Sequence, residues 1–433
     1  MKKILIAFFL FIPVMFSFAA GSQEKAAPAA EGPVSVDFYT WSDGNDQYSD
    51  LFNAFNAANT DVQINPQYIP PADYESKLTT LLAGGMNMDG YMQKRQVDMF
   101  AQNANGYIEP LNDLIKKHNF DYSTMKAWSA AIEVDGKVLA LPHRGGKYYT
   151  YYNVRPFIEK GLPTPTELVN KGEWTWDKFV ELSQQVSESD GKTFGSCLYT
   201  WGSCQIYPAA QNNVQYIDAK GKVDLNDYAL KSVQIRKILE DGLDMPKLVD
   251  LKVTKTHYSQ VMYSGMAPML LIGEWFPGMM ADGFKKGLVV DSFKPEDFRI
   301  TRLPSDSPDY YSVGAPTFGH VHSKSKNKDA AFEVLAWFAG NEGAKVEAGL
   351  GLLPPVINDD VKAILAENIL DKESLKYFTE DVSVRPMLYN KYGSKVEQLV
   401  ARFTELYLMN QISDADFLPE MRKELQTISD STD

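Results

Sequence analysis

The stretch LALPHRGGKYYTYYNVRPF, residues 139–157, combines one arginine, a Gly-Gly pair and four tyrosines within five positions. If these tyrosines lie in a strand, Tyr148 and Tyr149 point to opposite faces. We expect at least one face to be buried and the other to line a ligand cleft. Arg144 offers a planar fork of donors to ligand oxygens or to a bridging carboxylate. The alternative is a packing role, with the tyrosines in the core and Arg144 in an ion pair.

A second group of candidate residues follows the first predicted strand. The alternation in VSVDFYTW predicts a strand over residues 34–41, and SDGND then reads as a turn and helix start. The carboxyl ends of parallel strands face ligand crevices in open α/β sheets, and free N–H groups at a helix start can donate to a ligand. We therefore expect Trp41, Asp43 and Asn45 to contact a ligand. The alternative places Trp41 in the core and makes Asp43 a helix cap.

Other chemistries have weak or no support in the sequence. There is no Gly-x-Ser-x-Gly, His-Glu-x-x-His or phosphate-loop pattern, and we expect no cofactor and no metal. His320 and His322 lack an evident third ligand, so we interpret them as structural or surface residues. Cys197 and Cys204 are the two cysteines, and their spacing allows a disulfide across a turn.

Charge and composition describe an acidic globular chain. The 433 residues carry 56 acidic and 43 basic side chains, a formal net charge of −13. Such an excess of acid disfavours binding to nucleic acid or anionic membranes. The hydrophobic fraction of 44% is enough for a large core.

The first residues have the pattern of an export signal. A lysine pair precedes a short apolar run and small residues, which predicts a signal peptide over residues 1–19. Residues 20–33 are rich in Ala, Pro and Glu and are expected to form a flexible tether. No cysteine lies at the junction to carry a lipid. We therefore expect a periplasmic or otherwise extracytoplasmic protein.

The pattern of elements favours an α/β fold. Helical periodicity at 48–59 and 73–85 flanks a second predicted strand at 62–69. This alternation of strands and helices is typical of a lobe with a largely parallel sheet. Farther along the chain, a helix is predicted at 175–189 and strands at 267–275 and 298–304.

Several blocks, in order along the chain, resemble one family. They are VDFYTWSDG…LFNAFN, DYESKLTTLLAGG, GYIEPLNDLI, GKVLALP, YYTYYNVRPFIEKGL, WTWDKFVELS, GEWFPGMM, ITRLPSDSP, SKSKNKDAAFEVLAWFAGNEGAK and GLLPP. Together they resemble family 1 of the extracellular solute-binding proteins, the carbohydrate-type receptors of ABC importers related to maltodextrin-binding proteins. This chain has Met88-Asp89-Gly90 where the family often has Pro-Asp-Val, and it has no lipidated cysteine.

The resemblance implies a two-lobed periplasmic-binding-protein fold, in which each lobe is a mainly parallel sheet flanked by helices. Several crossovers form the hinge between the lobes. By analogy, lobe 1 comprises residues 34–142 and 312–353. Lobe 2 comprises residues 145–309 and 354–433. The ligand would lie in the cleft between them.

Sugar chemistry explains why aromatic and polar residues would occur together in that cleft. Flat rings cover the C–H faces of a sugar, and fixed polar groups pair with its hydroxyls, which are costly to desolvate alone. The resemblance places Trp275 at a sugar-stacking position, with Glu274 as a weaker hydroxyl acceptor. It places six further side chains near the ligand or at the start of a contributing helix: Tyr199, Trp201, Phe318, Arg385, Tyr389 and Tyr392.

The implied function is capture of a sugar or oligosaccharide by hinge closure and its delivery to inner-membrane permease subunits. We expect a monomer that binds no nucleic acid and has no enzyme activity. Two alternatives stay open. One is a receptor of the same fold for a peptide, polyamine or acidic sugar, and the other, less favoured, is a secreted glycoside hydrolase.

Overall fold

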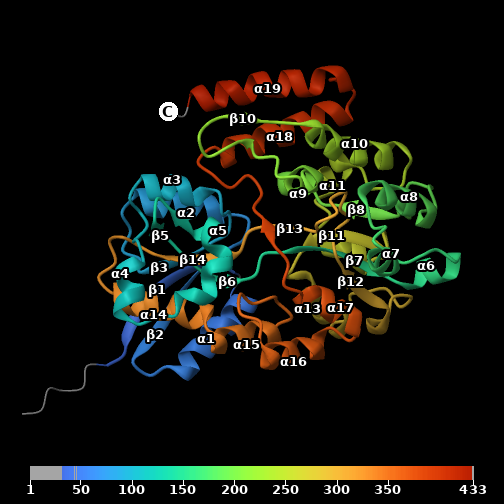
Figure 1. The fold of residues 1–433 in the computed structure, drawn as a ribbon. Helices are drawn as coiled ribbons and strands as arrows, with labels where there is room; N and C mark the ends of the chain where they lie inside the picture. The colour runs from blue at the N-terminus through green and yellow to red at the C-terminus, as the bar shows by residue number, and fades with distance from the viewer. Residues whose placement is uncertain (1–31, 43, 45, 432–433) are drawn as a thin grey trace, which may run out of the picture.

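The computed structural model describes residues 32–42, 44 and 46–431, and shows two α/β lobes side by side (Figure 1). The predicted signal peptide, most of the tether, Asp43 and Asn45 lie outside the described residues. The two-lobed architecture expected from the sequence is confirmed. No helix among the described residues is long and apolar enough to cross a membrane.

The sheet of lobe 1 has five strands in the order β2-β1-β3-β14-β6. Its strands are β1 Val34–Trp41, β2 Val62–Ile69, β3 Gly90–Gln93, β6 Leu141–Arg144 and β14 Thr317–Val321. Strand β1 runs parallel to β2 and β3, whereas β14 runs antiparallel to β3 and β6. This sheet is therefore mixed: β1, β2, β3 and β6 share one direction, and β14 runs opposite to them on returning from lobe 2.

Helices cover both faces of this sheet. Alternate residues of β1 face the core, where Phe38 packs against Phe52 of α1 and Phe338 of α14. Asp46 caps α1 through a reciprocal pair of bonds with Ser49. The helices are α1 Gln47–Ala58, α2 Tyr74–Ala83, α3 Asp98–Ala104, α4 Asn112–Lys117, α5 Ser129–Ile132, α14 Lys328–Ala339 and α15 Asn341–Gly349, with a 3₁₀ segment at Tyr122–Trp128 and a small hairpin of β4 Glu133–Val134 and β5 Lys137–Val138.

The sheet of lobe 2 has four strands in the order β12-β7-β11-β8. They are β7 Tyr148–Asn153, β8 Ser196–Leu198, β11 Met269–Gly273 and β12 Phe298–Thr301. Strand β7 is antiparallel to both of its neighbours, and β11 pairs with β8 in parallel. This sheet is also mixed: β8, β11 and β12 share one direction, and β7, which arrives from the hinge, runs opposite to them.

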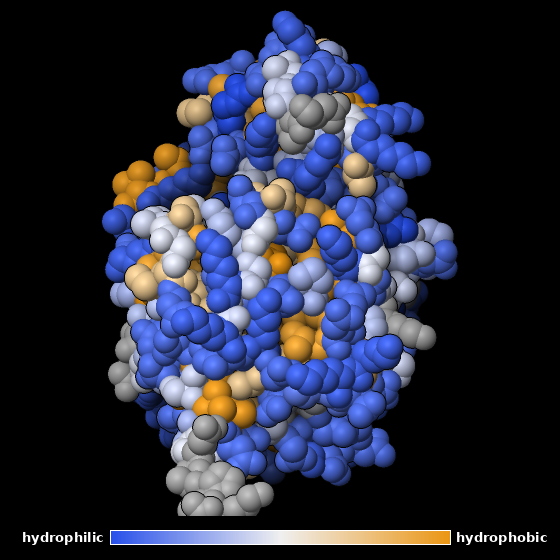
Figure 2. Space-filling view, turned by 90° about the vertical axis from the view of Figure 1, so that its left-hand side faces the viewer, coloured by the Kyte–Doolittle hydropathy of each residue, from blue (hydrophilic) through white to orange (hydrophobic). Residues whose placement is uncertain are grey.

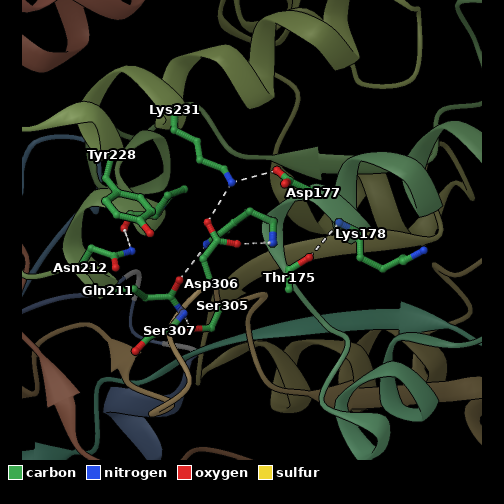
Figure 3. Close-up of polar contacts among 12 residues, drawn as sticks. Thr175, Asp177, Lys178, Gln211, Asn212, Tyr228, Lys231, Ser305, Asp306 and Ser307 are labelled. Carbon is green, nitrogen blue, oxygen red and sulfur yellow. Dashed lines mark hydrogen bonds and ion pairs between the residues drawn. The ribbon is translucent and has the colours of Figure 1, made fainter.

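The helices of lobe 2 surround this sheet. They are α6 Arg155–Lys160, α7 Pro165–Lys171, α8 Trp176–Val186, α9 Tyr207–Gln211, α10 Asp227–Asp241, α11 Leu248–Thr254, α12 Tyr258–Tyr263, α13 Phe276–Lys285, α16 Asp359–Asn368 and α17 Lys372–Thr379, with 3₁₀ turns at Gly202–Gln205 and Pro295–Asp297. Figure 3 shows Lys231 of α10 between two carboxylates, 2.8 Å from Asp177 and 2.9 Å from Asp306. Asp306 also accepts the backbone N–H of Trp176, so this network holds the chain after β12 against α8 and α10.

A third core joins the C-terminal helices α18 Gly393–Leu408 and α19 Asp414–Asp430 to α10 and to the hairpin of β9 Tyr216–Ile217 and β10 Val223–Asp224. These helices lie together at the top of Figure 1. Figure 2 shows the side of the molecule formed largely by lobe 1, which is mostly hydrophilic with small, separate hydrophobic patches. A surface of this kind is consistent with the acidic composition.

The lobes are joined where the chain passes from β6 to β7, from β13 Ser312–Val313 to β14, and from α15 to α16. Strand β13 also pairs in parallel with β15 Val384–Arg385. Two glycines make the first two passages possible. Gly146 has φ +60° and Gly314 has φ +145°, and a Cβ on Gly146 would lie 1.9 Å from the Ala315 carbonyl oxygen. The crossing chains therefore touch through their backbones.

The predicted lobe boundaries remain a prediction, but some residues near them can be placed. Strand β6 extends through Arg144 and belongs to the sheet of lobe 1. Helix α15 lies between the lobes (Figure 1), and its Ala344 and Ala348 pack in the core of lobe 2. Tyr389, from a segment assigned to lobe 2, packs in the core of lobe 1.

Candidate functional site

Two tryptophans follow the strand ends that face the interlobe boundary. Trp41 ends β1 in lobe 1, and Trp275 lies just after β11 in lobe 2. Both side chains are partly exposed. The Trp41 ring is 4.8 Å from that of Tyr48 between centroids. The Trp275 ring is 5.8 Å from that of Tyr148, and its indole N–H donates to the Tyr258 hydroxyl over 2.9 Å.

Trp275 belongs to a group of aromatic side chains that we call the lobe 2 aromatic cluster: Tyr148, Tyr199, Trp201, Tyr258 and Trp275. Ring centroids are 5.9 Å apart for Trp201 and Trp275, and 5.1 Å apart for Tyr199 and Trp201. Trp201 is 38% exposed, which is unusual for so large an apolar ring in a packed cluster. The cluster therefore offers flat surface to a ligand.

A buried ion pair joins the two lobes at the base of their junction. Arg144, from β6 of lobe 1, places its Nε 3.2 Å from Oε1 of Glu274, which follows β11 of lobe 2, and both side chains are almost fully buried. Burial acts to lower the pKa of Arg144, but Glu274 together with Tyr48, Glu347 and Tyr258 outweighs it and the pKa is raised. Burial raises the pKa of Glu274, and the charge of Arg144 opposes that rise. The pair holds the lobes together at this point.

A second buried pair lies next to the first. His143, also in β6, places Nδ1 2.5 Å from Oε1 of Glu347 on α15. Tyr48 of α1 also belongs to this group. Its ring centroid lies 5.8 Å from that of His143, and the charge of Arg144 opposes the rise in the Tyr48 pKa that burial causes. We call these residues, with Arg144 and Glu274, the hinge cluster.

Several buried polar atoms of the hinge cluster have no hydrogen-bond partner among the described residues. They are the Tyr48 hydroxyl, Nε and Nη1 of Arg144, Nε2 of His143, both carboxylate oxygens of Glu274 and Oε2 of Glu347. The contact between Arg144 and Glu274 is an ion pair without hydrogen-bond geometry. Buried polar groups in native proteins are nearly always paired with protein, water or ligand, since each orphan costs about 1–3 kcal/mol. The hinge cluster thus presents donors and acceptors suited to hydroxyl groups or ordered water.

Six of the residues expected at the ligand are brought together at the junction of the lobes: Arg144, Tyr148, Tyr199, Trp201, Glu274 and Trp275. Trp41 contacts Tyr48 and Tyr74 within lobe 1. Tyr48, Tyr258, His143 and Glu347 were not expected at the junction. Tyr258 lies at the start of α12 in a stretch, THYSQVMY, that gives no signal of a site. Its contact with Trp275 depends entirely on packing between distant segments.

Tyr149 does not share the cleft. It lies on the opposite face of β7 from Tyr148 and is 3% exposed. Its hydroxyl donates to the Phe378 carbonyl over 2.8 Å, and its ring lies 5.1 Å from that of Phe378. The alternation of the strand accounts for this result, because only one of its two aromatic faces can be turned to the cleft. The structure makes Tyr149 a packing residue.

Phe318, Arg385 and Tyr389 are also engaged elsewhere. Phe318 is fully buried in the core of lobe 1. The Arg385 guanidinium lies 3.7 Å from the centroid of the Tyr311 ring and donates to the Gln211 carbonyl. Tyr389 donates its hydroxyl to the Ala131 carbonyl in lobe 1, with its ring 5.2 Å from that of Phe100. These side chains fix the hinge and the lobe contacts rather than extend into the cleft.

The candidate disulfide is absent. Cys197 and Cys204 are free and buried. Cys197 lies in β8, where its position is set by pairing with Leu270, and the Cys204 sulfur accepts the Tyr207 hydroxyl at 3.0 Å. The short spacing allowed a bridge, but the sheet and the following 3₁₀ turn hold the two thiols in separate contacts.

Three cations of lobe 1 are paired with carboxylates. Arg95, which follows β3 of lobe 1, pairs with Glu397 of α18 over 2.9 Å, and Lys94 pairs with Glu75 over 3.4 Å. Arg144 is paired with Glu274 as described. An acidic ligand would have to displace one of these carboxylates, so the electrostatics favour a neutral ligand.

A separate groove lies on lobe 1 between α2 and the edge strand β2, with a volume of about 380 Å³. Its lining includes Tyr39, Gln67 and Thr80 but none of the residues that join the lobes. It is therefore distinct from the candidate site.

Two sheet-based lobes with an aromatic, polar site at their junction define a two-lobed binding protein. Residues 41–345 match the family described as bacterial extracellular solute-binding protein, and the chain belongs to that family. It is 22% identical over 353 residues to an arabinooligosaccharide-binding protein of Bacillus subtilis (strain 168), covering 79% of this chain and 77% of that protein.

Solved structures show the same fold. A sugar transporter from Rhizobium etli in an open conformation superposes with a TM-score of 0.73 at 25% identity, covering 91% of this chain and 99% of that one. An ABC substrate-binding protein from Listeria monocytogenes in complex with cycloalternan gives a TM-score of 0.74 at 20% identity, covering 91% and 98%.

Proposed function

We propose that this protein is the extracytoplasmic substrate-binding component of an ABC importer, and that it captures a neutral sugar or oligosaccharide between its lobes. The observation that carries the proposal is a run of residues across the junction of the lobes. The Trp41 ring contacts Tyr48, the Tyr48 ring contacts His143 beside Arg144, and Arg144 pairs with Glu274 beside Trp275. This run links an aromatic surface of one lobe to that of the other across buried polar groups.

The chemistry of the site matches a saccharide. Partly exposed rings on both sides suit the C–H faces of sugar rings, and the orphan polar atoms of the hinge cluster suit their hydroxyls. The similarity to an arabinooligosaccharide-binding protein supports the same ligand class. The proposed contact set is Trp41, Tyr48, Arg144, Tyr148, Tyr199, Trp201, Tyr258, Glu274 and Trp275, with Asp43 and Asn45 kept from the sequence prediction.

The mechanism proposed is hinge closure. A ligand that touches both lobes binds the closed arrangement more tightly than the open one, and so shifts the population toward closure. The closed complex then docks on membrane permease subunits. We propose that the protein acts as a monomer in the periplasm or an equivalent extracytoplasmic space.

The competing functions are less well supported. A polyamine would need unpaired carboxylates and an acidic sugar an unpaired cation, but Glu274 and Arg144 neutralise each other. A glycoside hydrolase needs two carboxyl groups beside the sugar, one of them free to donate a proton. Glu274 is committed to Arg144, and Glu347 contacts His143 next to that pair. Incubation with oligosaccharides and assay of released sugar tests this point.

Thermal-shift screening against neutral, acidic and amino sugars, peptides and polyamines tests the proposal, since a ligand of the folded form raises the melting temperature. We expect hits among neutral saccharides, and mass spectrometry of co-purified solute to identify the same class. Hits confined to peptides or polyamines would overturn the proposal. Matched titrations with a neutral sugar and its uronate separate the two sugar classes.

A further inference from the structure

The hinge cluster contains more carboxylates than cations that can pair with them at neutral pH. Glu274 and Glu347 are both fully buried, and Arg144 is the cation between them. His143 provides the fourth group, and it contacts Glu347 directly. The cluster is electrically neutral only when His143 and Glu347 hold one proton between them, since Arg144 balances Glu274.

The four groups also belong to different parts of the hinge. His143 and Arg144 are neighbours on β6 of lobe 1, whereas Glu274 follows β11 of lobe 2. Glu347 lies on α15, which packs against both α1 and α16. Arg144 is influenced by the charges of both carboxylates. Its ion pair with Glu274 reaches the end of a lobe 2 strand, whereas Glu347 lies on a helix that contacts both lobes.

We propose that the proton shared by His143 and Glu347 controls the Arg144–Glu274 bridge, so that lobe separation and ligand affinity depend on pH. While the proton is present, Glu347 is satisfied by His143 and Arg144 is held by lobe 2. When the proton leaves, Glu347 is a full anion and competes with Glu274 for Arg144. The bridge between the lobes then weakens. The ligand part of this inference rests on the proposed function, and the lobe-separation part does not.

The direction of the pKa shifts agrees with this arrangement. Burial raises the pKa of Glu347 well above its ordinary 4.5, although Arg144 opposes the rise and Glu274 adds to it. Burial, and then the charge of Arg144, lowers the pKa of His143 well below its ordinary 6.5. The folded pair therefore takes up a second proton at lower pH than a free histidine would, and keeps its single proton to higher pH than a free glutamate would. Tyr48 and Tyr258 are also titratable and are influenced by the charge of Arg144, and burial raises the pKa of both hydroxyls, which keeps them neutral.

The His143–Glu347 pair makes the free energy of unfolding depend on pH in a definite direction. Between the ordinary pKa values of 4.5 and 6.5, the unfolded pair also holds one proton, so folding exchanges none. Above 6.5 the unfolded pair holds no proton, so stability falls as pH rises for as long as the folded pair keeps its proton. The loss is about tenfold in the folding constant for each pH unit.

The test uses spin labels on the two lobes to measure their separation in the ligand-free protein from about pH 5 to about pH 10, where one-proton linkage would be seen. We compare wild type, Glu347→Gln and a control, Glu342→Gln, which changes an exposed carboxylate on the same helix. Wild type and the control should show a separation that changes with pH. Glu347→Gln should show a constant one, because an amide cannot gain the charge that competes for Arg144.

A second measurement needs only the wild type, so it tests the inference even if Glu347→Gln does not fold. The ¹⁵N chemical shifts of His143 should stay constant through its ordinary pKa, while His257, a partly exposed histidine, titrates near or below it. Unchanged lobe separation in wild type over the whole range, identical profiles for wild type and Glu347→Gln, or titration of His143 like a free histidine would each overturn the inference. If no saccharide binds but the separation still follows pH, the proposed ligand is wrong and the switch stands.

Discussion

Arg144 of lobe 1 and Glu274 of lobe 2 form a nearly fully buried ion pair, with Nε and Oε1 3.2 Å apart, at the point where the chain crosses between the lobes. Each charge is costly to bury alone, and the other is its compensation. The ion pair therefore holds the two lobes together at the base of the junction where we propose that the ligand binds.

Removal of one partner of this pair should be far more harmful than removal of both. We expect Glu274→Ala to lower the free energy of unfolding by about 3–5 kcal/mol, because it leaves a buried guanidinium uncompensated. The double variant Arg144→Met with Glu274→Met should recover most of that loss. Urea unfolding measures both, and equal losses in the single and double variants would contradict the interpretation.

The aromatic surface should contribute to binding rather than to folding. Trp275→Ala should weaken binding of the saccharide found by screening by about 2 kcal/mol, roughly 30-fold, as truncation of a central tryptophan does at other binding sites. Isothermal titration calorimetry measures the change.

Tyr149→Phe is the matched control for that experiment. It removes only a hydroxyl on the far face of β7, whose hydrogen bond to Phe378 is worth about 1 kcal/mol of stability. Its affinity for the saccharide should equal that of the wild type. Equal affinity losses in the two variants would show that Trp275 acts through the fold.

The crossing at Gly146 should tolerate no side chain. Gly146→Ala meets both a positive φ and a Cβ position 1.9 Å from the Ala315 carbonyl oxygen. Gly161→Ala provides the comparison, since it has φ +66° and no atom within 4 Å of its Cβ position. We expect a loss of about 1 kcal/mol for Gly161→Ala and on the order of 3 kcal/mol more for Gly146→Ala. Similar losses would indicate that backbone strain alone matters.

The two thiols should be inert until the protein unfolds. Burial raises the pKa of Cys197 to about 12 and of Cys204 to about 11, so neither is a thiolate at pH near 8. A thiol reagent should label neither cysteine in the native protein and both after denaturation without reductant. Absence of labelling in the denatured protein would reveal a disulfide and contradict the structure.

The local sequence pattern predicted those helices and strands whose structure depends on residues close in sequence. The alternation in Val34–Trp41 predicted β1 and placed Trp41 at its end, and the predicted helix at 175–189 corresponds to α8 with Thr175 as its cap. These features depend on neighbours in sequence. The order of blocks along the chain then predicted the two-lobed fold.

Side-chain contacts between segments that are distant in sequence could not be predicted from local patterns. The strand pattern of Tyr148 and Tyr149 showed that they point apart, but it carries no information about which face meets the cleft. Tyr389 lies before a helix of the C-terminal core, yet it inserts into lobe 1 against Phe100. The hinge cluster was missed because Glu347 reads as one more acidic residue on a helix, and its burial beside His143 arises only from tertiary packing.

Small-angle X-ray scattering with and without the identified saccharide tests the central claim most directly, because closure of two lobes over a ligand must change the overall dimensions of the molecule. At saturation we predict a smaller radius of gyration for the wild type, and only partial compaction for Trp275→Ala at the lowest saccharide concentration that saturates the wild type. A radius that stays the same when the wild type is saturated would contradict it.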